Sequence, residues 1–121
     1  MTQESSSQCL FCRIATGAMA TPLVWSDDEF VAFRDIAPQA PVHVLVVPRR
    51  HLESVSALAG EDPAYAGRFL RAAVTVARQE GLDDPERGFR LVANTGPEGG
   101  QSVFHLHAHL LGGQRLGWHP A

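Results

Sequence analysis

The chain has 121 residues, 45% of them hydrophobic, which is enough for one hydrophobic core but leaves little room for a second. Its formal net charge of −3 argues against binding to a nucleic-acid backbone as the main activity. No signal peptide or long apolar run is recognisable. We therefore expect a soluble cytoplasmic protein with no nucleic-acid or membrane partner. A single domain over residues 9–121 would follow a mobile polar tail over residues 1–8.

The first half of the chain predicts one short helix and three strands. The helix is expected near Leu10 to Thr16, because Gly17 supplies a stop. The strands are expected around Leu23 to Ser26, at Phe30 to Phe33, and from His43 to Val47, where Pro48 ends the run.

The second half predicts one long helix and two further strands. Asp62 or Pro63 begins the helix, which runs through Glu80 before Gly81. Five apolar residues recur there at helical spacing: Tyr65, Phe69, Ala72, Ala73 and Val76. The strands are Phe89 to Ala93 and Phe104 to Leu111. Hairpin-like neighbours beside one long helix indicate an α+β fold, an antiparallel sheet covered by helices.

Three histidines, His105, His107 and His109, occupy alternate positions in the last expected strand. Alternate residues of a strand project from one face, and a core face is rarely built from imidazoles, which must be desolvated and paired. One ion held by all three is awkward, because the outer Cα atoms would lie roughly 13 Å apart. The spacing instead favours divided roles: one ring as nucleophile or base, with its neighbours binding an anion, a leaving group or a separate metal.

A glycine-rich segment, Asn94 to Ser102, directly precedes the histidines. Its glycines allow the backbone to approach a ligand and to turn several N–H groups toward one anion. On its own, Asn-x-Gly-Pro is better explained as an ordinary turn. The position before three histidines favours a phosphate cradle.

Cys9 and Cys12 form a C-x-x-C pair and are the two cysteines of the chain. The pair could be half of a zinc site, a redox pair or two unrelated thiols. A redox pair normally belongs to a thioredoxin-like βαβ unit, which this chain lacks. Zinc would need two more ligands from distant residues, usually histidines.

Three segments carry a resemblance to a known family. Gly99 to Gly113 resembles the signature of the histidine triad (HIT) superfamily, in its Hint-like purine nucleoside phosphoramidase branch. Phe33 to His51 resembles the upstream segment of that family, and Phe11 to Ile14 resembles its first helix. The similarity runs from about Cys9 to Trp118. It implies a five-stranded antiparallel sheet with one long and one short helix, and a homodimer whose sheets join across the subunits.

The resemblance also implies roles for the motifs. The implied catalytic group is Ser102, His105, His107 and His109, with His107 as the nucleophile that attacks phosphorus. The implied ligands of a structural zinc ion are Cys9, Cys12, His51 and His105.

A nucleotide pocket is likewise implied. Asp35 would accept both ribose hydroxyls, and Phe33 and Ile36, with Phe11, would contact the base, although such apolar residues also serve as core. The implied phosphate contacts are Asn94, Gly99, Gln101, Ser102, His107 and His109. Arg34 replaces a histidine found in the family, which leaves the base contact open. His43 matches a histidine of the site, and Trp118 matches a tryptophan that reaches a partner subunit.

The resulting hypothesis is a zinc-containing, homodimeric hydrolase that cleaves the P–N bond of purine nucleoside 5′-phosphoramidates through a nucleotidyl-histidine. One alternative is a dinucleoside polyphosphate hydrolase. A second is a regulatory nucleotide-binding protein with negligible turnover. A third, a zinc-binding interaction module, would leave His107 and His109 without a purpose.

Overall fold

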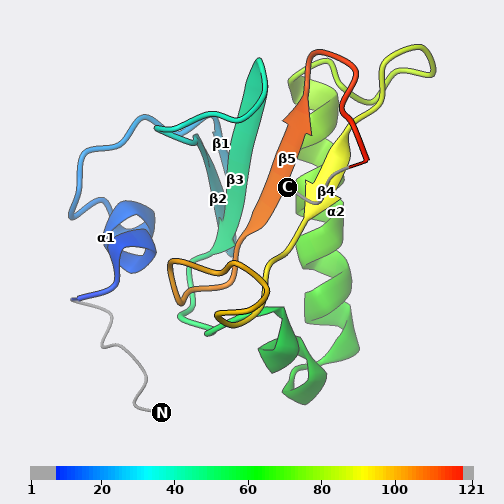
Figure 1. Cartoon of the computed structure of the whole chain (residues 1–121). Helices are drawn as coiled ribbons and strands as arrows, with labels where there is room; N and C mark the ends of the chain where they lie inside the picture. Colours follow the sequence, from blue (N-terminus) through cyan, green and yellow to red (C-terminus); the bar gives the residue numbers. More distant parts are fainter. Residues whose placement is uncertain (1–7, 119–121) are drawn as a thin grey trace.

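The computed structural model of the chain describes residues 8–118 (Figure 1). The predicted tail over residues 1–8 lies almost wholly outside these residues. The elements are α1 (Leu10–Thr16), β1 (Trp25–Ser26), β2 (Phe30–Arg34), β3 (Val42–Pro48), the 3-10 helix η1 (Val55–Gly60), α2 (Pro63–Gln79), β4 (Arg90–Val92) and β5 (Ala108–Gly112). Among the described residues, none of the helices is long and apolar enough to cross a membrane.

The two α-helices begin and end where their capping residues predict. The Cys9 side chain accepts the Cys12 N–H at the start of α1, and Gly17 ends the helix at φ 84°. The Asp62 carboxylate accepts the Ala64 N–H at the start of α2, next to Pro63. The predicted positions of both helices are therefore confirmed.

All five strands form one antiparallel sheet in the order β1-β2-β3-β5-β4. This confirms the α+β class and the five-stranded sheet. Alternation along β2 sends Phe30 and Ala32 to the face covered by α2, and Val31 and Phe33 to the face covered by α1. Each face has its own apolar cluster, and Figure 1 shows the two helices on opposite sides of the sheet.

The prediction that one strand carries all three histidines is wrong. β5 begins at Ala108, so His105 and His107 precede it and His109 lies within it. Pairing between β3 and β5 stops at Val46 and Ala108, two residues before Pro48, which has no N–H to donate. The carbonyl of Pro48 instead accepts the His105 ring.

The remaining strand boundaries differ by one or two residues. β1 and β4 are shorter than predicted, β2 gains Arg34, and β3 includes Val42 and Pro48. The helix η1 was not predicted, because none of its residues is buried and its sequence has no apolar periodicity.

Candidate active site

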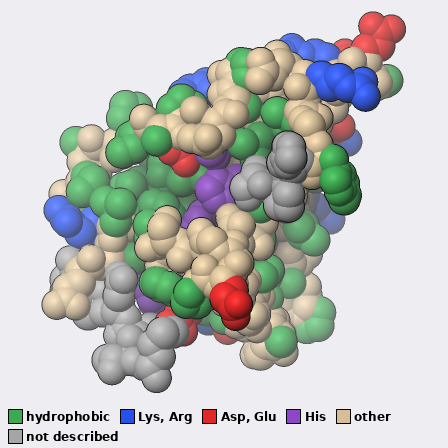
Figure 2. All heavy atoms as spheres, in the orientation of Figure 1, with side chains coloured by type: hydrophobic (Ala, Val, Ile, Leu, Met, Phe, Trp, Pro, Cys, Tyr) green, Lys and Arg blue, Asp and Glu red, His purple; other side chains and the backbone are tan. Residues whose placement is uncertain are grey.

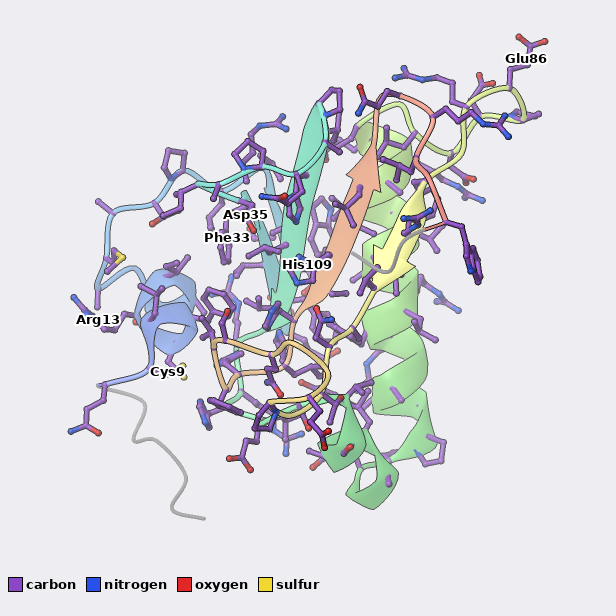
Figure 3. The ribbon with its side chains drawn as sticks, in the orientation of Figure 1. Cys9, Arg13, Phe33, Asp35, Glu86 and His109 are labelled. Atoms are coloured by element: carbon purple, nitrogen blue, oxygen red, sulfur yellow. The ribbon has the colours of Figure 1, made fainter. Side chains whose placement is uncertain are left out.

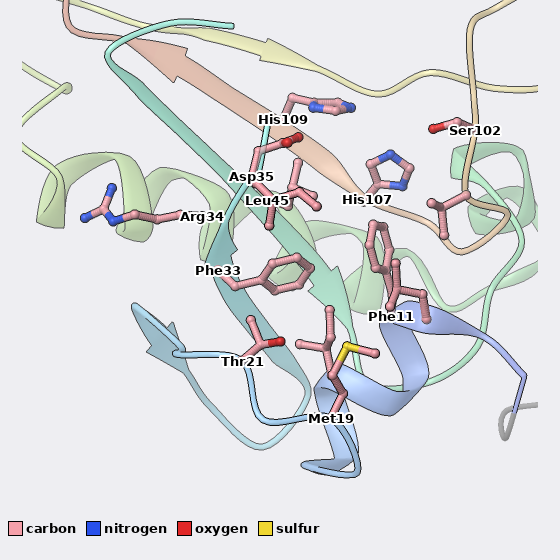
Figure 4. Close-up of a pocket in the computed structure, with 14 residues that line it drawn as sticks. Phe11, Met19, Thr21, Phe33, Arg34, Asp35, Leu45, Ser102, His107 and His109 are labelled. Atoms are coloured by element: carbon pink, nitrogen blue, oxygen red, sulfur yellow. The ribbon is translucent and has the colours of Figure 1, made fainter. Parts of the chain in front are cut away.

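A cavity of about 360 Å³ opens beside α1 on the sheet face that bears His109 (Figure 4). Seven residues predicted to bind the nucleotide line it: Phe11, Phe33, Asp35, Ile36, Ser102, His107 and His109. Figure 2 shows histidine atoms within a recess bordered by hydrophobic side chains, and Figure 3 places Phe33, Asp35 and His109 in one region of the sheet. The structure therefore brings together residues from α1, from β2 and the segment after it, and from β5 and the loop before it.

His107 has one ring nitrogen directed to the backbone and the other left for the cavity. Its Nδ1 lies 2.7 Å from the carbonyl oxygen of His105. A carbonyl can only accept, so Nδ1 carries the proton and Nε2 keeps its lone pair. Burial lowers the pKa of His107, which further favours the neutral ring. The second nitrogen is therefore a potential nucleophile.

His109 is held by His43, which is itself oriented by the backbone. The N–H of Gln39 donates to Nδ1 of His43 (3.0 Å), so the proton of the neutral His43 ring is on Nε2. That nitrogen lies 2.9 Å from Nδ1 of His109. His109 therefore accepts at Nδ1 and presents Nε2–H as a donor.

The same tautomer argues against metal binding by Asp35, His43 and His109. Their ligand atoms lie within 4.8 Å of one another, which could suit an ion. However, a metal needs the lone pair of His43 Nε2, so the ring proton would have to move to Nδ1. There it would point at the Gln39 N–H, and two donors would face each other. This group is better described as a hydrogen-bonded chain.

The neutral state of His109 has a clear physical cause. Desolvation lowers its pKa to about 4, and the neighbouring His107 and His43 rings add to this lowering. The carboxylate of Asp35 opposes the shift. His109 is therefore a neutral hydrogen-bond donor near pH 7.

Asp35 follows β2 directly and is half-buried. One carboxylate oxygen accepts the Ala37 N–H (2.8 Å), and the other lies 3.5 Å from Nε2 of His43. The backbone N–H of Asp35 donates to the His43 carbonyl (3.0 Å). The carboxylate is therefore fixed at the edge of the cavity with acceptor capacity remaining.

Arg34 and Ile36 flank this carboxylate in different ways. The Arg34 side chain points away from the Phe33 ring in Figure 4 and forms an ion pair with Glu80 (2.7 Å). Arg34, which departs from the family pattern, thus lines the cavity with its guanidinium paired to Glu80. Ile36 is fully exposed at the rim, so it is not a core residue.

Three predicted phosphate contacts, Asn94, Gly99 and Gln101, do not line the cavity. The Asn94 amide donates to the carbonyl of Gly99 (2.7 Å). Gln101 is buried, accepts the Gly96 N–H, and donates to the carbonyls of Glu53 and Val103. Both side chains thus shape the glycine-rich loop, and their contact with a nucleotide stays a prediction.

The four predicted metal ligands, Cys9, Cys12, His51 and His105, come together beside the cavity. Their donor atoms lie within 4.8 Å of one another, and Nδ1 of His105 is 3.2 Å from the Cys9 sulfur. Nε2 of His105 donates to the carbonyl of Pro48 (2.8 Å), so Nδ1 keeps its lone pair for a metal. Two thiols and two imidazoles at these separations fit a tetrahedral zinc ion.

Sequence reasoning did not identify several residues that line the cavity. Leu10 and Ile14 come from α1, Met19 and Thr21 from the segment after it, and Leu45 from β3. Ile14 follows Phe11 by one helical turn, a spacing that could have indicated a shared face. Trp118 is 94% exposed in this chain, and its predicted contact with a partner subunit stays a prediction.

Comparison with known proteins gives a consistent result. The family model of the HIT domain matches residues 17–116. The chain is 43% identical over 118 residues to adenylylsulfatase HINT1 of Arabidopsis thaliana, covering 96% of this chain and 78% of the relative. It is 40% identical over 112 residues to the purine nucleoside phosphoramidase of Escherichia coli K12, covering 93% and 92%.

The fold is also shared with solved structures. The crystal structure of a HIT family hydrolase from Legionella pneumophila Philadelphia 1 superposes with a TM-score of 0.87 and is 41% identical, covering 94% of this chain and 100% of that chain. With the family match over most of its length and these two named relatives, the chain belongs to the HIT family, in its Hint-like branch.

Proposed function

We propose that this HIT-family hydrolase cleaves the P–N bond of purine nucleoside 5′-phosphoramidates. The observation that carries the proposal is the His107 ring, whose Nδ1–H is tied to the His105 carbonyl at 2.7 Å and whose Nε2 is thereby left for a substrate in the cavity. The 40% identity to a purine nucleoside phosphoramidase supports the choice of bond.

In this proposal His107 is a covalent catalyst. Its Nε2 lone pair forms a bond to the α-phosphorus, and the P–N bond to the protonated amine breaks. Water then attacks phosphorus, the bond to His107 breaks, and a nucleoside monophosphate and a proton are released. Nε2–H of His109 and the hydroxyl of Ser102 would hydrogen-bond the phosphate oxygens as charge shifts among them.

The walls of the cavity suit a ribonucleoside. Asp35 would accept the 2′- and 3′-hydroxyls, and Phe33 and Phe11, whose rings meet edge-to-face at 5.4 Å, would contact the base. Apolar faces select for a planar base and do not by themselves choose between adenine and guanine.

The metal is proposed to be zinc, held by Cys9, Cys12, His51 and His105. Zinc would join the segments that carry these ligands and would supply no chemistry to the substrate. We further propose a cytoplasmic homodimer. β4 is an edge strand, and Leu91 on it is 37% exposed, so this edge can continue the sheet into a second copy.

The decisive experiment compares wild type with His107→Ala, using an adenosine 5′-phosphoramidate as substrate. We expect rapid release of the amine by wild type and none by the variant, which should still fold and bind AMP because His107 is not a metal ligand. Activity retained in the variant would refute the nucleophile assignment.

The same assay separates the alternatives. Faster cleavage of a diadenosine polyphosphate would identify a dinucleoside polyphosphate hydrolase, and faster cleavage of adenosine 5′-phosphosulfate would match the activity named for the plant relative. AMP binding without cleavage would indicate a regulatory nucleotide-binding protein. Absence of AMP binding would indicate a zinc-binding interaction module.

A further inference from the structure

The segment of α1 and its N-cap contributes both to the metal cluster, by which we mean the four predicted ligands Cys9, Cys12, His51 and His105, and to the cavity. Cys9 and Cys12 place their sulfurs in the metal cluster, while Leu10, Phe11 and Ile14 line the cavity. A seven-residue helix does not persist in isolation, so its order depends on what holds it to the sheet. Its buried residues belong to the apolar cluster on this face and share none with the cluster beneath α2.

The Phe11 ring occupies the boundary between the two sites. Its centroid lies 5.9 Å from the ring of His105, 5.1 Å from that of His107 and 5.4 Å from that of Phe33. All three contacts are edge-to-face, and Phe11 is only 4% exposed. A metal ligand, the proposed nucleophile and the proposed base contact therefore pack against one side chain.

A second connection joins the segment that carries His51 to the histidine segment. Three hydrogen bonds link residues 48–53 to residues 101–106: His105 Nε2 to the Pro48 carbonyl (2.8 Å), Leu106 N–H to the Leu52 carbonyl (2.6 Å), and the Gln101 amide to the Glu53 carbonyl (2.7 Å). The predicted metal ligands thus lie on three segments. Two of them, α1 and residues 101–107, contribute to the cavity wall, and the third is hydrogen-bonded to residues 101–106.

We propose that metal binding orders the nucleotide cavity through Phe11, so that metal and nucleoside monophosphate bind with positive cooperativity. The inference rests on the proposed function for the identity of the nucleotide. A metal that joins α1 to His51 and His105 fixes Phe11 against His107, so a nucleotide no longer loses free energy by ordering that wall. Linkage then requires the nucleotide to tighten metal binding by the same factor, about fivefold or more.

The test is a closed thermodynamic cycle with zinc and AMP as the two ligands. Under reducing conditions, calorimetry measures AMP affinity for zinc-loaded and metal-free protein, and competition with a chromophoric chelator measures zinc affinity with and without AMP. We expect both ratios to be equal and about fivefold or more. Equal AMP affinity in the two states overturns the inference and leaves the proposed function intact.

Phe11→Leu tests the route of the coupling. The variant keeps all four metal ligands, so zinc affinity without AMP should match wild type, while AMP affinity should fall and lose its dependence on zinc. Phe89→Leu, which alters an aromatic residue packed against the opposite cluster, should keep the full ratio. A full ratio in Phe11→Leu would overturn the role of Phe11.

Amide hydrogen exchange gives a readout that needs no nucleotide. Removing zinc should reduce protection in α1 and in residues 48–53 and 101–107, and should leave α2 protected. Uniform loss of protection, or no loss, overturns the inference. If AMP binds in neither metal state, the proposed function fails, and the exchange pattern alone decides whether the metal orders the cavity.

Discussion

At the scale of single residues, each imidazole of the site has its role set by one neighbouring acceptor or donor. The Pro48 carbonyl directs Nδ1 of His105 to the metal cluster, and the His105 carbonyl directs Nε2 of His107 to the cavity. The sequence predicted these residues but not which carbonyl oxygen His105 would meet, because Pro48 lies 57 residues away and is brought to it only by the fold.

Asp35→Asn tests ribose recognition. An amide has only one acceptor oxygen, and that oxygen carries no charge. We therefore expect KM to rise about tenfold or more, since a hydrogen bond to a charged group contributes about 1.5–3 kcal/mol, with a smaller change in kcat. Steady-state kinetics with ribo- and 2′-deoxyribonucleotide substrates measures the change. Asp28→Asn in the exposed turn before β2 is the control. An unchanged preference for ribose would contradict the role of Asp35.

The lowered pKa of His109 predicts a loss of stability in acid. Its pKa is about 4 in the folded protein and about 6.5 in an unfolded chain, so between these values the unfolded state binds more protons. Stability should therefore fall as the pH drops from 6.5 toward 4. His107, His43 and Asp35 are the titratable groups that face this ring. Urea unfolding across this range should show a shallower pH slope in His109→Gln. An equal slope would indicate that His109 is not the source.

At the scale of elements, the glycine-rich loop depends on one close approach between backbone segments. A Cβ atom on Gly99 would collide with the carbonyl oxygen of Thr95, so any side chain there must displace the loop. Gly99→Ala should lower kcat/KM by roughly ten- to a hundredfold, because Ser102 follows the same loop. Its melting temperature should change little. Gly60→Ala, where a Cβ meets nothing within 4 Å, is the control. Wild-type activity in Gly99→Ala would show that catalysis does not depend on the conformation of this loop.

Helices were predicted from sequence more accurately than strands. The ends of α1 and α2 follow from local signals at Gly17, Asp62, Pro63 and Gly81, and both were located to within about one residue. The start of β5 depends on Pro48, which lies on another strand and ends the pairing there. Periodicity within the histidine segment carries no information about that partner.

At the scale of the whole molecule, the dimer prediction concerns the two edges of the sheet. Leu91→Arg on β4 places a charge on the edge proposed to meet a second copy, so the solution mass should fall from twice that of the chain to once. Light scattering after size exclusion measures this mass. Leu23→Arg, beside the opposite edge strand β1 and 42% exposed in the single chain, should leave it unchanged. The reverse result would place the interface at β1.

The metal cluster shows the limit of prediction at this scale. Cys9 and His105 are 96 residues apart, and nothing in their spacing indicates that they meet. The C-x-x-C pair alone left three interpretations open, and the family resemblance supplied the two histidines. The structure brings all four side chains together because α1 folds over the sheet face opposite α2.

Pro48, which ends β3, limits how far the pairing between β3 and β5 can extend. If the ladder between β3 and β5 continued past Val46, the backbone of residues 105–107 would be committed to the sheet, and the His105 carbonyl would no longer be reserved for the His107 ring. The orientation of the His107 ring therefore depends on the missing N–H of Pro48. A substitution that restored this pairing would extend β5 and release the ring of His107, the proposed nucleophile, from the His105 carbonyl.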